Sequence, residues 1–495
     1  MERLSYKTLE DLKYNGYLLK DAPEKVLQFG EGGFLRAFVD YFFDLANEKH
    51  GFGGKVAVVQ PIAQGMSERI NEQEGLYTLY LRGFQDGKTV NERRVISCVS
   101  RCINPYTDYQ AYLDCAHNPE LRYIVSNTTE AGIAYDEGST FEQTPPVTFP
   151  AKLTRFLYER YLAFGKEKGK GMIILSCELI DNNGQELRRC VEKYIDQWKL
   201  EDGFRKWVEE ENLFCSSLVD RIVTGYPRAE AEKLNAENGW EDQLIDTGEI
   251  FGAWVIEGPE WLAEELPFCD GELPVIVTAD HKPYKQRKVR ILNGAHTTMV
   301  TGAYLAGQDI VRECMKDEDI SSYMNKALYE EIIPTLTLPE KELKDFAASV
   351  RERFANPFID HQLLSITLNS VSKWRARCMP SLKGYMDKFG KVPACLAMGL
   401  SCLIAFYRGN RMEEGALIAE RPGGGTYAVK DDAKVLEFFL RHSGDEPRTL
   451  AHEVMANTEF WGEDLTKLPG LEKAVADGLE KVLKDGARAA LKSVL

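Results

Sequence analysis

The sequence predicts an α/β fold for the first half of the chain and a mostly α-helical second half. Up to about residue 280, short runs of β-branched residues alternate with helical patterns, which is typical of a parallel sheet covered by helices on both faces. Beyond that point long amphipathic segments replace the strands. A chain of 495 residues is also longer than a single hydrophobic core usually supports. We therefore expect two domains, residues 1–280 and residues 281–495.

Five apolar, β-branched runs of the first half are predicted strands. They are residues 26–29, 56–59, 123–126, 172–176 and 274–278. A helix is expected to follow the first strand from about Gly33. In the second half, helices are expected over residues 321–333, 340–354 and 393–407. The glycine-rich segment 421–425 lacks the Lys-Ser/Thr of a P-loop, so it is expected to be an ordinary loop.

The charge balance excludes several classes of partner. The chain has 61 Lys and Arg against 77 Asp and Glu, a net charge of −16. The electrostatic field of this negative charge repels nucleic acid and anionic membrane surfaces, so neither is expected as a partner. The longest apolar run, near residues 394–407, is shorter than the ~20 residues that a membrane span needs. Any anionic ligand must therefore find positive charge locally at its site.

The cysteines indicate a reducing compartment. Eleven of them are spread singly along the chain, and no CxxC pair occurs. The N-terminus begins no apolar signal core, so a cytoplasmic protein is expected. No His/Cys/Glu cluster has metal-ligand spacing, and no metal is expected. The sequence leaves open whether the chain is a monomer or a small homo-oligomer.

A glycine-rich turn follows the first predicted strand. It reads Phe-Gly-Glu-Gly-Gly-Phe-Leu-Arg-Ala-Phe over residues 29–38. Glycines let a backbone approach a pyrophosphate, and the next helix offers its positive end. Two features depart from the dinucleotide-binding pattern: Leu35 replaces the third glycine, and Gln60 replaces the acid after the second strand. The motif thus predicts a dinucleotide site without choosing between NAD and NADP; the alternative is a structural turn without a ligand.

A second group of polar residues opens the helical half. If the segment is helical from Lys288 at ~100° per residue, then Lys288, Asn293 and His296 fall within roughly 140° of one another. One helix could then present an amine, an amide and an imidazole together. These groups suit carbonyl reduction, because a hydride that reaches the carbonyl carbon leaves negative charge on oxygen, which a lysine can stabilise and protonate. The alternatives are a packed histidine and a solvated basic surface.

Together the two motifs resemble the mannitol dehydrogenase family of polyol-specific long-chain dehydrogenases. The turn matches the family element F-G-x-G-x-F-x-R-A, and residues 288–296 match K-x4-N-x2-H. Within the family, the chain is most similar to a branch that reduces keto sugar acids. That similarity extends along nearly the whole chain, through residues 126–132, 177–181, 220–227, 356–357, 361–365 and 404–409. It implies an extended Rossmann-type NAD-binding domain followed by a mostly helical substrate domain, and catalysis without a metal.

The resemblance also implies roles for particular residues. Lys288 is the implied general acid/base, and Asn293 and His296 are implied to bind the reacting oxygen. The implied cofactor is NAD, and its implied contacts are Gln28, Phe29, Gly30, Glu31, Gly32, Gly33, Phe34, Leu35, Arg36 and Asn127.

One departure from the family leaves a role open. Mannitol-type members have Cys-Asp-Asn where this chain has Cys177-Glu178-Leu179, and that asparagine helps to bind the substrate oxygen. Leu179 cannot do so, and Asn183 is the nearby candidate for a second donor.

The resemblance implies reversible, NADH-dependent reduction of D-tagaturonate to D-altronate in hexuronate breakdown. The alternatives are the same chemistry on the epimeric D-fructuronate, a neutral polyol substrate, and a dinucleotide-binding sensor without catalysis. An acid substrate needs a cation for its carboxylate. The candidates are Lys373, Arg375 and Arg377, of which at most one arginine should face the site because the two are two residues apart; Lys285 and Arg353 come next.

Overall fold

The computed structural model describes residues 1–269 and 271–495. The chain divides into two compact units, which we describe separately. The first comprises Met1–Arg82 and Val90–His281, and the second comprises Gly83–Thr89 and Lys282–Leu495. The sequence did not predict that residues 83–89 belong to the second unit.

The first unit is built on a six-stranded sheet in the order β5-β2-β1-β6-β7-β8. Every neighbouring pair in it is parallel. The strands are β1 (Glu24–Phe29), β2 (Lys55–Val59), β5 (Val99–Ile103), β6 (Tyr123–Ser126), β7 (Ile173–Ser176) and β8 (Leu213–Cys215). In chain order this is 3-2-1-4-5-6, the strand order of a Rossmann dinucleotide-binding sheet. The predicted fold class is confirmed.

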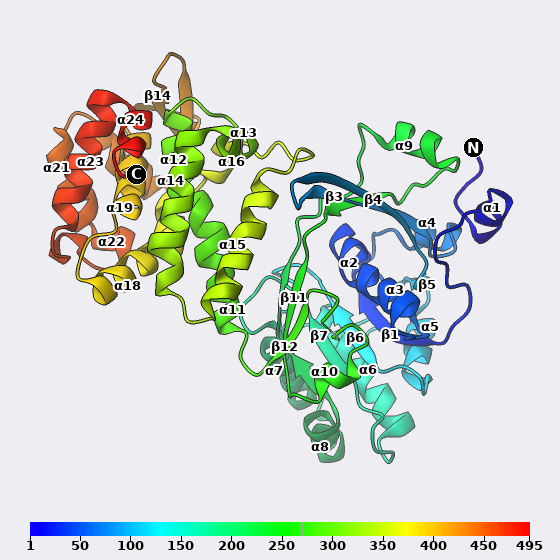
Figure 1. Cartoon of the computed structure of the whole chain (residues 1–495). Coiled ribbons are helices and arrows are strands. Elements are labelled where there is room, and N and C mark those ends of the chain that lie inside the picture. Colours follow the sequence, from blue (N-terminus) through cyan, green and yellow to red (C-terminus); the bar gives the residue numbers. More distant parts are fainter. Residues whose placement is uncertain (270) are drawn as a thin grey trace. The chain divides into compact units, whose positions relative to one another are not determined.

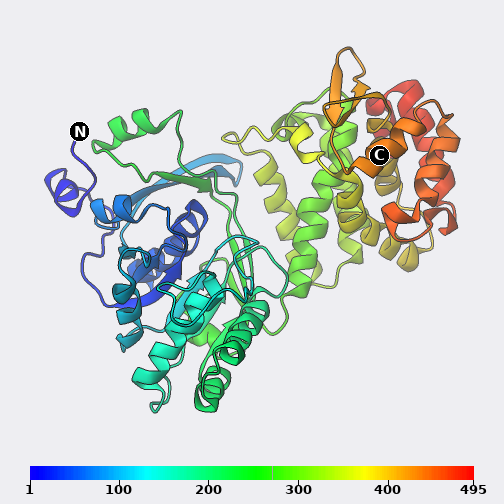
Figure 2. The same cartoon turned by 180° about the vertical axis from the view of Figure 1, so that it is seen from behind.

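Helices cover both faces of this sheet, as Figures 1 and 2 show. Alternate side chains of β1 point to opposite faces: Val26 packs in one hydrophobic cluster, and Leu27 and Phe29 pack in another. The first cluster includes side chains of α3 (Val39–Lys49), and the second those of α6 (Phe149–Phe164) and α7 (Asn183–Gln197). Burial on two faces explains why the strands read as continuous apolar runs.

The rest of the first unit surrounds this core. Two three-stranded sheets have the orders β10-β3-β4 and β12-β11-β9. Their strands are β3 (Tyr77–Gln85), β4 (Lys88–Ile96), β9 (Ser217–Asp220), β10 (Asp246–Glu249), β11 (Ala253–Glu257) and β12 (Val275–Thr278). The end of β3 and the start of β4 fall within residues 83–89 and so belong to the second unit. The remaining helices are α1 (Tyr6–Asp11), α2 (Gly33–Ala37), α4 (Ser67–Glu72), α5 (Tyr109–Asp114), η1 (Cys115–His117), α8 (Asp202–Glu211), α9 (Ala231–Asn238) and α10 (Leu262–Glu265).

The second unit is mostly helical, as predicted. Its first half contains α11 (Lys282–Arg287), η2 (Lys288–Asn293), α12 (Gly294–Leu305), α13 (Val311–Lys316), α14 (Glu318–Lys326), η3 (Ala327–Ile332), η4 (Ile333–Thr335), α15 (Glu340–Phe354) and α16 (Leu363–Ile366). Its second half contains α17 (Ser370–Arg377), α18 (Met379–Phe389), α19 (Ala394–Phe406), α20 (Ala433–Arg441), α21 (Pro447–Ala456), α22 (Thr458–Trp461), η5 (Leu465–Lys467), α23 (Leu471–Asp485) and α24 (Ala487–Lys492).

Two features of this unit differ from the sequence-based expectation. An antiparallel sheet of β13 (Gly409–Glu413), β14 (Ala416–Glu420) and β15 (Thr426–Val429) follows α19, with the glycine-rich segment 421–425 as a loop inside it. The helix expected over 321–333 is α14 followed by the π turn η3. The apolar helix α19 is buried, and among the described residues no helix is both long and apolar enough to cross a membrane.

Candidate active site

The glycine turn lies where β1 ends, between β1 and α2. Gly30 has a φ of +122°, a conformation that L side chains rarely adopt. A Cβ atom at this position would lie 3.0 Å from the backbone oxygen of Asn127 and 3.1 Å from Leu35 Cδ1. A Cβ atom on the exposed Gly32, in contrast, would meet no atom within 4 Å. The turn therefore needs glycine at 30 and leaves open space at 32.

The turn also lies where the strand order of the sheet reverses. β1 has β2 on one side and β6 on the other. The Gly30 N–H donates to the Val59 oxygen (3.1 Å), and the Asn127 N–H donates to the Phe29 oxygen (3.2 Å). Ligands of open α/β sheets bind outside the carboxyl ends of the strands at this reversal point. The structure thus brings Asn127 beside the turn, as a shared cofactor site requires.

Several side chains predicted to contact the cofactor are instead buried beneath the turn. Phe29 packs in the sheet core against Phe149, with 4.9 Å between ring centroids, and Leu35 is buried as well. Gln28 donates an amide N–H to the Gly30 oxygen (3.2 Å). These side chains shape the turn from below, and only their backbone can approach a ligand.

The Arg36 side chain is also bonded to other groups of the protein. Its guanidinium donates to the backbone oxygens of Glu31 (3.2 Å) and Leu244 (2.6 Å), and it lies 3.5 Å from the Asp246 carboxylate. A pyrophosphate would therefore be met by the backbone of residues 30–34 rather than by this arginine. A dinucleotide fits the turn on two grounds: Gly30 excludes a side chain, and Gly32 faces open space at the strand-order reversal.

In the second unit, Lys288, Asn293 and His296 lie on one continuous helical segment formed by α11, η2 and α12. The expectation of a regular α-helix from Lys288 is wrong, because residues 288–293 form a π turn. Hydrogen bonds in a π turn link residues five apart, so Lys288 and Asn293 lie one turn apart on the same side of the helix. His296 follows three residues after Asn293, which is neighbour spacing on an α-helix. The π turn brings the lysine and the asparagine closer in direction than an α-helix would.

The His296 imidazole lies between two rings that the sequence motif did not include. It stacks on Phe354 with 3.9 Å between ring centroids and 8° between ring planes, and the His361 ring meets it edge-on at 5.5 Å. Among the described residues, its buried Nε2 atom has no hydrogen-bond partner. Burial, followed by the charges of His361 and Arg353, holds the pKa of His296 well below its usual range. The imidazole is therefore neutral, and its Nε2 atom is available to a ligand as far as the described residues show.

The side chains of the three predicted carboxylate-binding cations of α17 point in two different directions. Lys373 and Arg377 are four residues apart, and both also lower the pKa of His296. Arg377 donates to Thr297 Oγ1 (3.3 Å), and Lys373 donates to the Ile366 oxygen (2.9 Å). Arg375 is exposed and lies beside Gly462, at the end of α22. Arg377 and Lys373 thus face the His296 group, and Arg375 does not.

The assignment of Asn183 as a second donor is wrong. Its side-chain amide donates to the backbone oxygens of Glu178 (2.9 Å) and Ser217 (3.0 Å). Its oxygen accepts from the N–H groups of Gly184 and Ser217, both at 2.9 Å. Both amide protons are therefore occupied, and none remains for a substrate. Leu179 is 64% exposed and offers no polar group.

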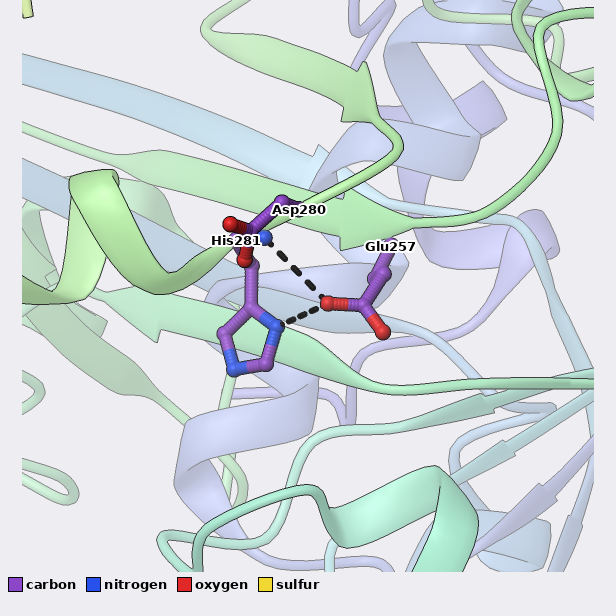
Figure 3. Close-up of side chains that lie close together, drawn as sticks. All are labelled: Glu257, Asp280 and His281. Carbon is purple, nitrogen blue, oxygen red and sulfur yellow. Dashed lines mark hydrogen bonds and ion pairs between the residues drawn. The ribbon is translucent and has the colours of Figure 1, made fainter.

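One group of side chains in the described part of the chain could geometrically hold a metal ion: Glu257, Asp280 and His281 in the first unit. Sequence spacing could not show it, because Glu257 lies far from the other two along the chain. Figure 3 shows the His281 ring turned towards the Glu257 carboxylate, with Nδ1 2.5 Å from Oε2. The His281 backbone N–H donates to the same oxygen (3.2 Å). This pairing anchors the chain to the end of β11 just before α11 begins.

Comparisons with known proteins agree with this architecture. The model of the mannitol dehydrogenase Rossmann domain matches residues 24–269, and that of the mannitol dehydrogenase C-terminal domain matches residues 280–483. An altronate oxidoreductase of Pectobacterium carotovorum subsp. carotovorum is 46% identical over 491 residues, which cover 98% of this chain and 99% of that protein. An altronate oxidoreductase of Escherichia coli is 46% identical over 477 residues, 95% and 96% of the two chains. The chain belongs to the mannitol dehydrogenase family.

Two solved structures share the fold. A D-sorbitol dehydrogenase in substrate-free form matches with a TM-score of 0.80 and 22% identity, over 99% of this chain and 100% of that chain. The Pseudomonas fluorescens mannitol 2-dehydrogenase, in a ternary complex with NAD and D-mannitol, matches with a TM-score of 0.66 and 22% identity over 99% of each chain. The predicted family resemblance is confirmed.

Proposed function

We propose that this chain is an oxidoreductase that reversibly reduces D-tagaturonate to D-altronate with NADH. The observation that carries the proposal is its 46% identity, over 98% of its length, to a protein named altronate oxidoreductase. The site supports the same chemistry, because a dinucleotide-binding turn and a lysine–asparagine–histidine helix are both present. We propose a cytoplasmic enzyme whose oligomeric state is open between a monomer and a small homo-oligomer.

The second unit supplies the groups that act on the substrate oxygen. NADH, when bound, supplies the hydride. Lys288 Nζ donates a proton to the oxygen during reduction and takes it back in the reverse direction. The Asn293 amide and the neutral His296 imidazole hold the same oxygen, since negative charge develops on it. The unpartnered Nε2 of His296 is the nitrogen available for this contact.

The first unit holds the pyrophosphate of the cofactor through its backbone. The turn from Gly30 to Phe34 and the neighbouring Asn127 approach the pyrophosphate, and the buried side chains below keep the turn in shape. In this proposal, neither Asn183 nor Leu179 contacts the reacting oxygen.

Arg377 is the proposed partner of the substrate carboxylate. It faces His296 from one turn beyond Lys373, and its guanidinium can grip a carboxylate with two parallel N–H bonds. A protein with a net charge of −16 needs such a local cation to attract a sugar acid.

A steady-state assay of NADH oxidation with D-tagaturonate, D-fructuronate and D-fructose tests the proposal. We expect kcat/KM for D-tagaturonate to be the highest and that for D-fructose to be lower by at least ~10²-fold, because a site built for a carboxylate leaves its cation unpaired with a neutral sugar. A higher value for D-fructuronate would make the chain its reductase. Comparable values for D-fructose would overturn the acid substrate, and no turnover of any of the three would favour a sensor.

A further inference from the structure

The glycine turn carries an acid whose side chain leaves the turn. Glu31 comes directly after Gly30, and its carboxylate lies beside its own backbone N–H and that of Met66, both of which favour its charged form and so act to lower its pKa. Met66 lies in the segment that joins β2 to α4. The Glu31 side chain is buried, and burial raises the pKa of its carboxyl group. A carboxylate from the end of β1 therefore reaches the segment that follows β2.

Gln60 and Gly65 build the place that this carboxylate occupies. Gln60 is buried at the end of β2, where its amide donates to the backbone oxygens of Ile62 (2.8 Å) and Ala63 (3.1 Å). A side chain at Gly65 would overlap both the Glu31 carboxylate and the Gln60 amide. The glycine thus leaves room for the carboxylate of residue 31.

This is the position at which Rossmann-type proteins distinguish two cofactors. An acid at the end of the second strand hydrogen-bonds the 2′-hydroxyl of the adenosine ribose, whereas an arginine nearby receives a 2′-phosphate. Residues 60–66 read Gln-Pro-Ile-Ala-Gln-Gly-Met and contain neither an acid nor a cation. The side chain that brings a carboxylate there is that of Glu31. A carboxylate has about four acceptor positions, so the two neighbouring backbone N–H groups leave capacity for a ribose hydroxyl.

We infer that Glu31 replaces the missing acid of β2: its carboxylate accepts a hydrogen bond from the ribose 2′-hydroxyl and repels a 2′-phosphate. Glu31 is thereby the residue that selects NADH over NADPH. This inference rests on the proposed function, in which the chain binds a nicotinamide dinucleotide. A purely structural alternative is that the carboxylate only ties the segment after β2 to the turn.

Binding measurements on Glu31→Gln separate the two roles. The substitution keeps the shape and an acceptor oxygen for the Met66 N–H but removes the charge. We expect the ratio of Kd for NADPH to Kd for NADH, measured by fluorescence titration at fixed ionic strength, to fall about tenfold or more. The matched control is Glu68→Gln, which removes one exposed charge from the first turn of α4; its ratio should stay at the wild-type value. Circular dichroism checks that both variants are folded.

Two outcomes decide the inference. A lowered ratio in Glu31→Gln alone supports it. An unchanged ratio, whether or not both affinities fall together, overturns it, since the carboxylate is then only a structural tie.

The wild-type protein provides a test that needs no variant. We expect 2′-deoxy-NADH to bind about tenfold more weakly than NADH, because the Glu31 carboxylate loses its donor. Equal affinities would overturn the hydrogen bond. If the wild-type protein binds neither NADH nor NADPH, the proposed function fails as well; if it binds NADH and reduces the sugar acid with an unchanged ratio in Glu31→Gln, only this inference fails.

Discussion

The glycine turn and the helical segment 288–296 use their residues in opposite ways. In the turn, the side chains of Gln28 and Arg36 are bonded to backbone oxygens, so the surface that a pyrophosphate would meet is main chain. On the helix, the His296 Nε2 atom is buried without a partner among the described residues. In the proposed function, the first region selects the shape of the cofactor and the second supplies the reacting groups. A substitution should therefore affect binding in one region and turnover in the other.

The largest effect is expected for Lys288→Ala. Loss of the proton donor should lower kcat by ~10²-fold or more, while NADH still binds, because the turn lies in the other unit. Steady-state kinetics with D-tagaturonate measure the first quantity. A near-normal kcat would remove Lys288 from the mechanism.

A smaller effect is expected for the cations of α17. Arg377→Met should lower kcat/KM for D-tagaturonate by roughly 10- to 100-fold, because a charged hydrogen bond of about 1.5–3 kcal/mol is lost. Arg375→Met is the matched control, since this arginine is exposed beside Gly462, and it should change kcat/KM less than about twofold. Equal losses in both variants would show that overall charge, not a contact of Arg377, attracts the substrate. No loss in either would direct attention to Lys373, Lys285 and Arg353.

The sequence predicted the sheet better than it predicted the site. Runs buried on two faces, such as residues 123–126 in β6, were recognised because their apolar pattern depends on the strand itself. Strand β4 was missed, since it is largely exposed and has no such pattern. The assignment of residues 83–89 to the second unit depends on tertiary packing, which no local pattern records.

At the site, spacing identified residues but not their surroundings. The K-x4-N-x2-H spacing predicted that the three residues share one face of a helix. The π turn that aligns Lys288 with Asn293 is a backbone feature that residue types do not predict. Phe354 and His361 reach His296 from distant parts of the chain. Asn183 was chosen for its proximity in sequence, and its hydrogen bonds to the backbone could be seen only in the fold.

The two units should also respond to pH with opposite signs. In the first, burial raises the pKa of Asp40 from 3.8 to about 7. The folded state then keeps a proton that the unfolded state has released, so this stabilising contribution is full below pH 3.8 and is lost as the pH rises to about 7. Asp40→Asn should remove the loss. Its Tm relative to wild type should therefore rise by a few °C between about pH 4 and pH 8, as calorimetry can measure. A constant difference would contradict the buried, neutral carboxyl group.

In the second unit the pKa of His296 is lowered instead, mainly by burial. The contribution of this neutral imidazole to stability is present above the unfolded pKa of 6.5 and is lost as the pH falls below it. His296→Gln should gain Tm relative to wild type as the pH falls from about 7 to 5, the reverse of the Asp40→Asn trend. The same trend in both variants would mean that the two buried groups do not titrate as described.

The smallest effect is expected from removing metal ions. Dialysis against a chelator should leave NADH oxidation unchanged, because Nδ1 of His281 is bonded to Glu257 and the proposed reacting groups are Lys288, Asn293 and His296. Activity that is lost and then restored by Zn²⁺ or Mg²⁺ would assign a metal to the group of Glu257, Asp280 and His281.

The division between a shape-selecting turn and a reacting helix is tested most directly by titrating NADH into Gly30→Val and Lys288→Ala side by side, with fluorescence or calorimetry on folded protein. A valine at residue 30 meets a φ of +122° and the Asn127 oxygen, so the turn must change shape. The account predicts that Gly30→Val loses NADH affinity by at least about tenfold, whereas Lys288→Ala binds NADH as wild type does. Unchanged affinity in Gly30→Val, or an equal loss in Lys288→Ala, would contradict it.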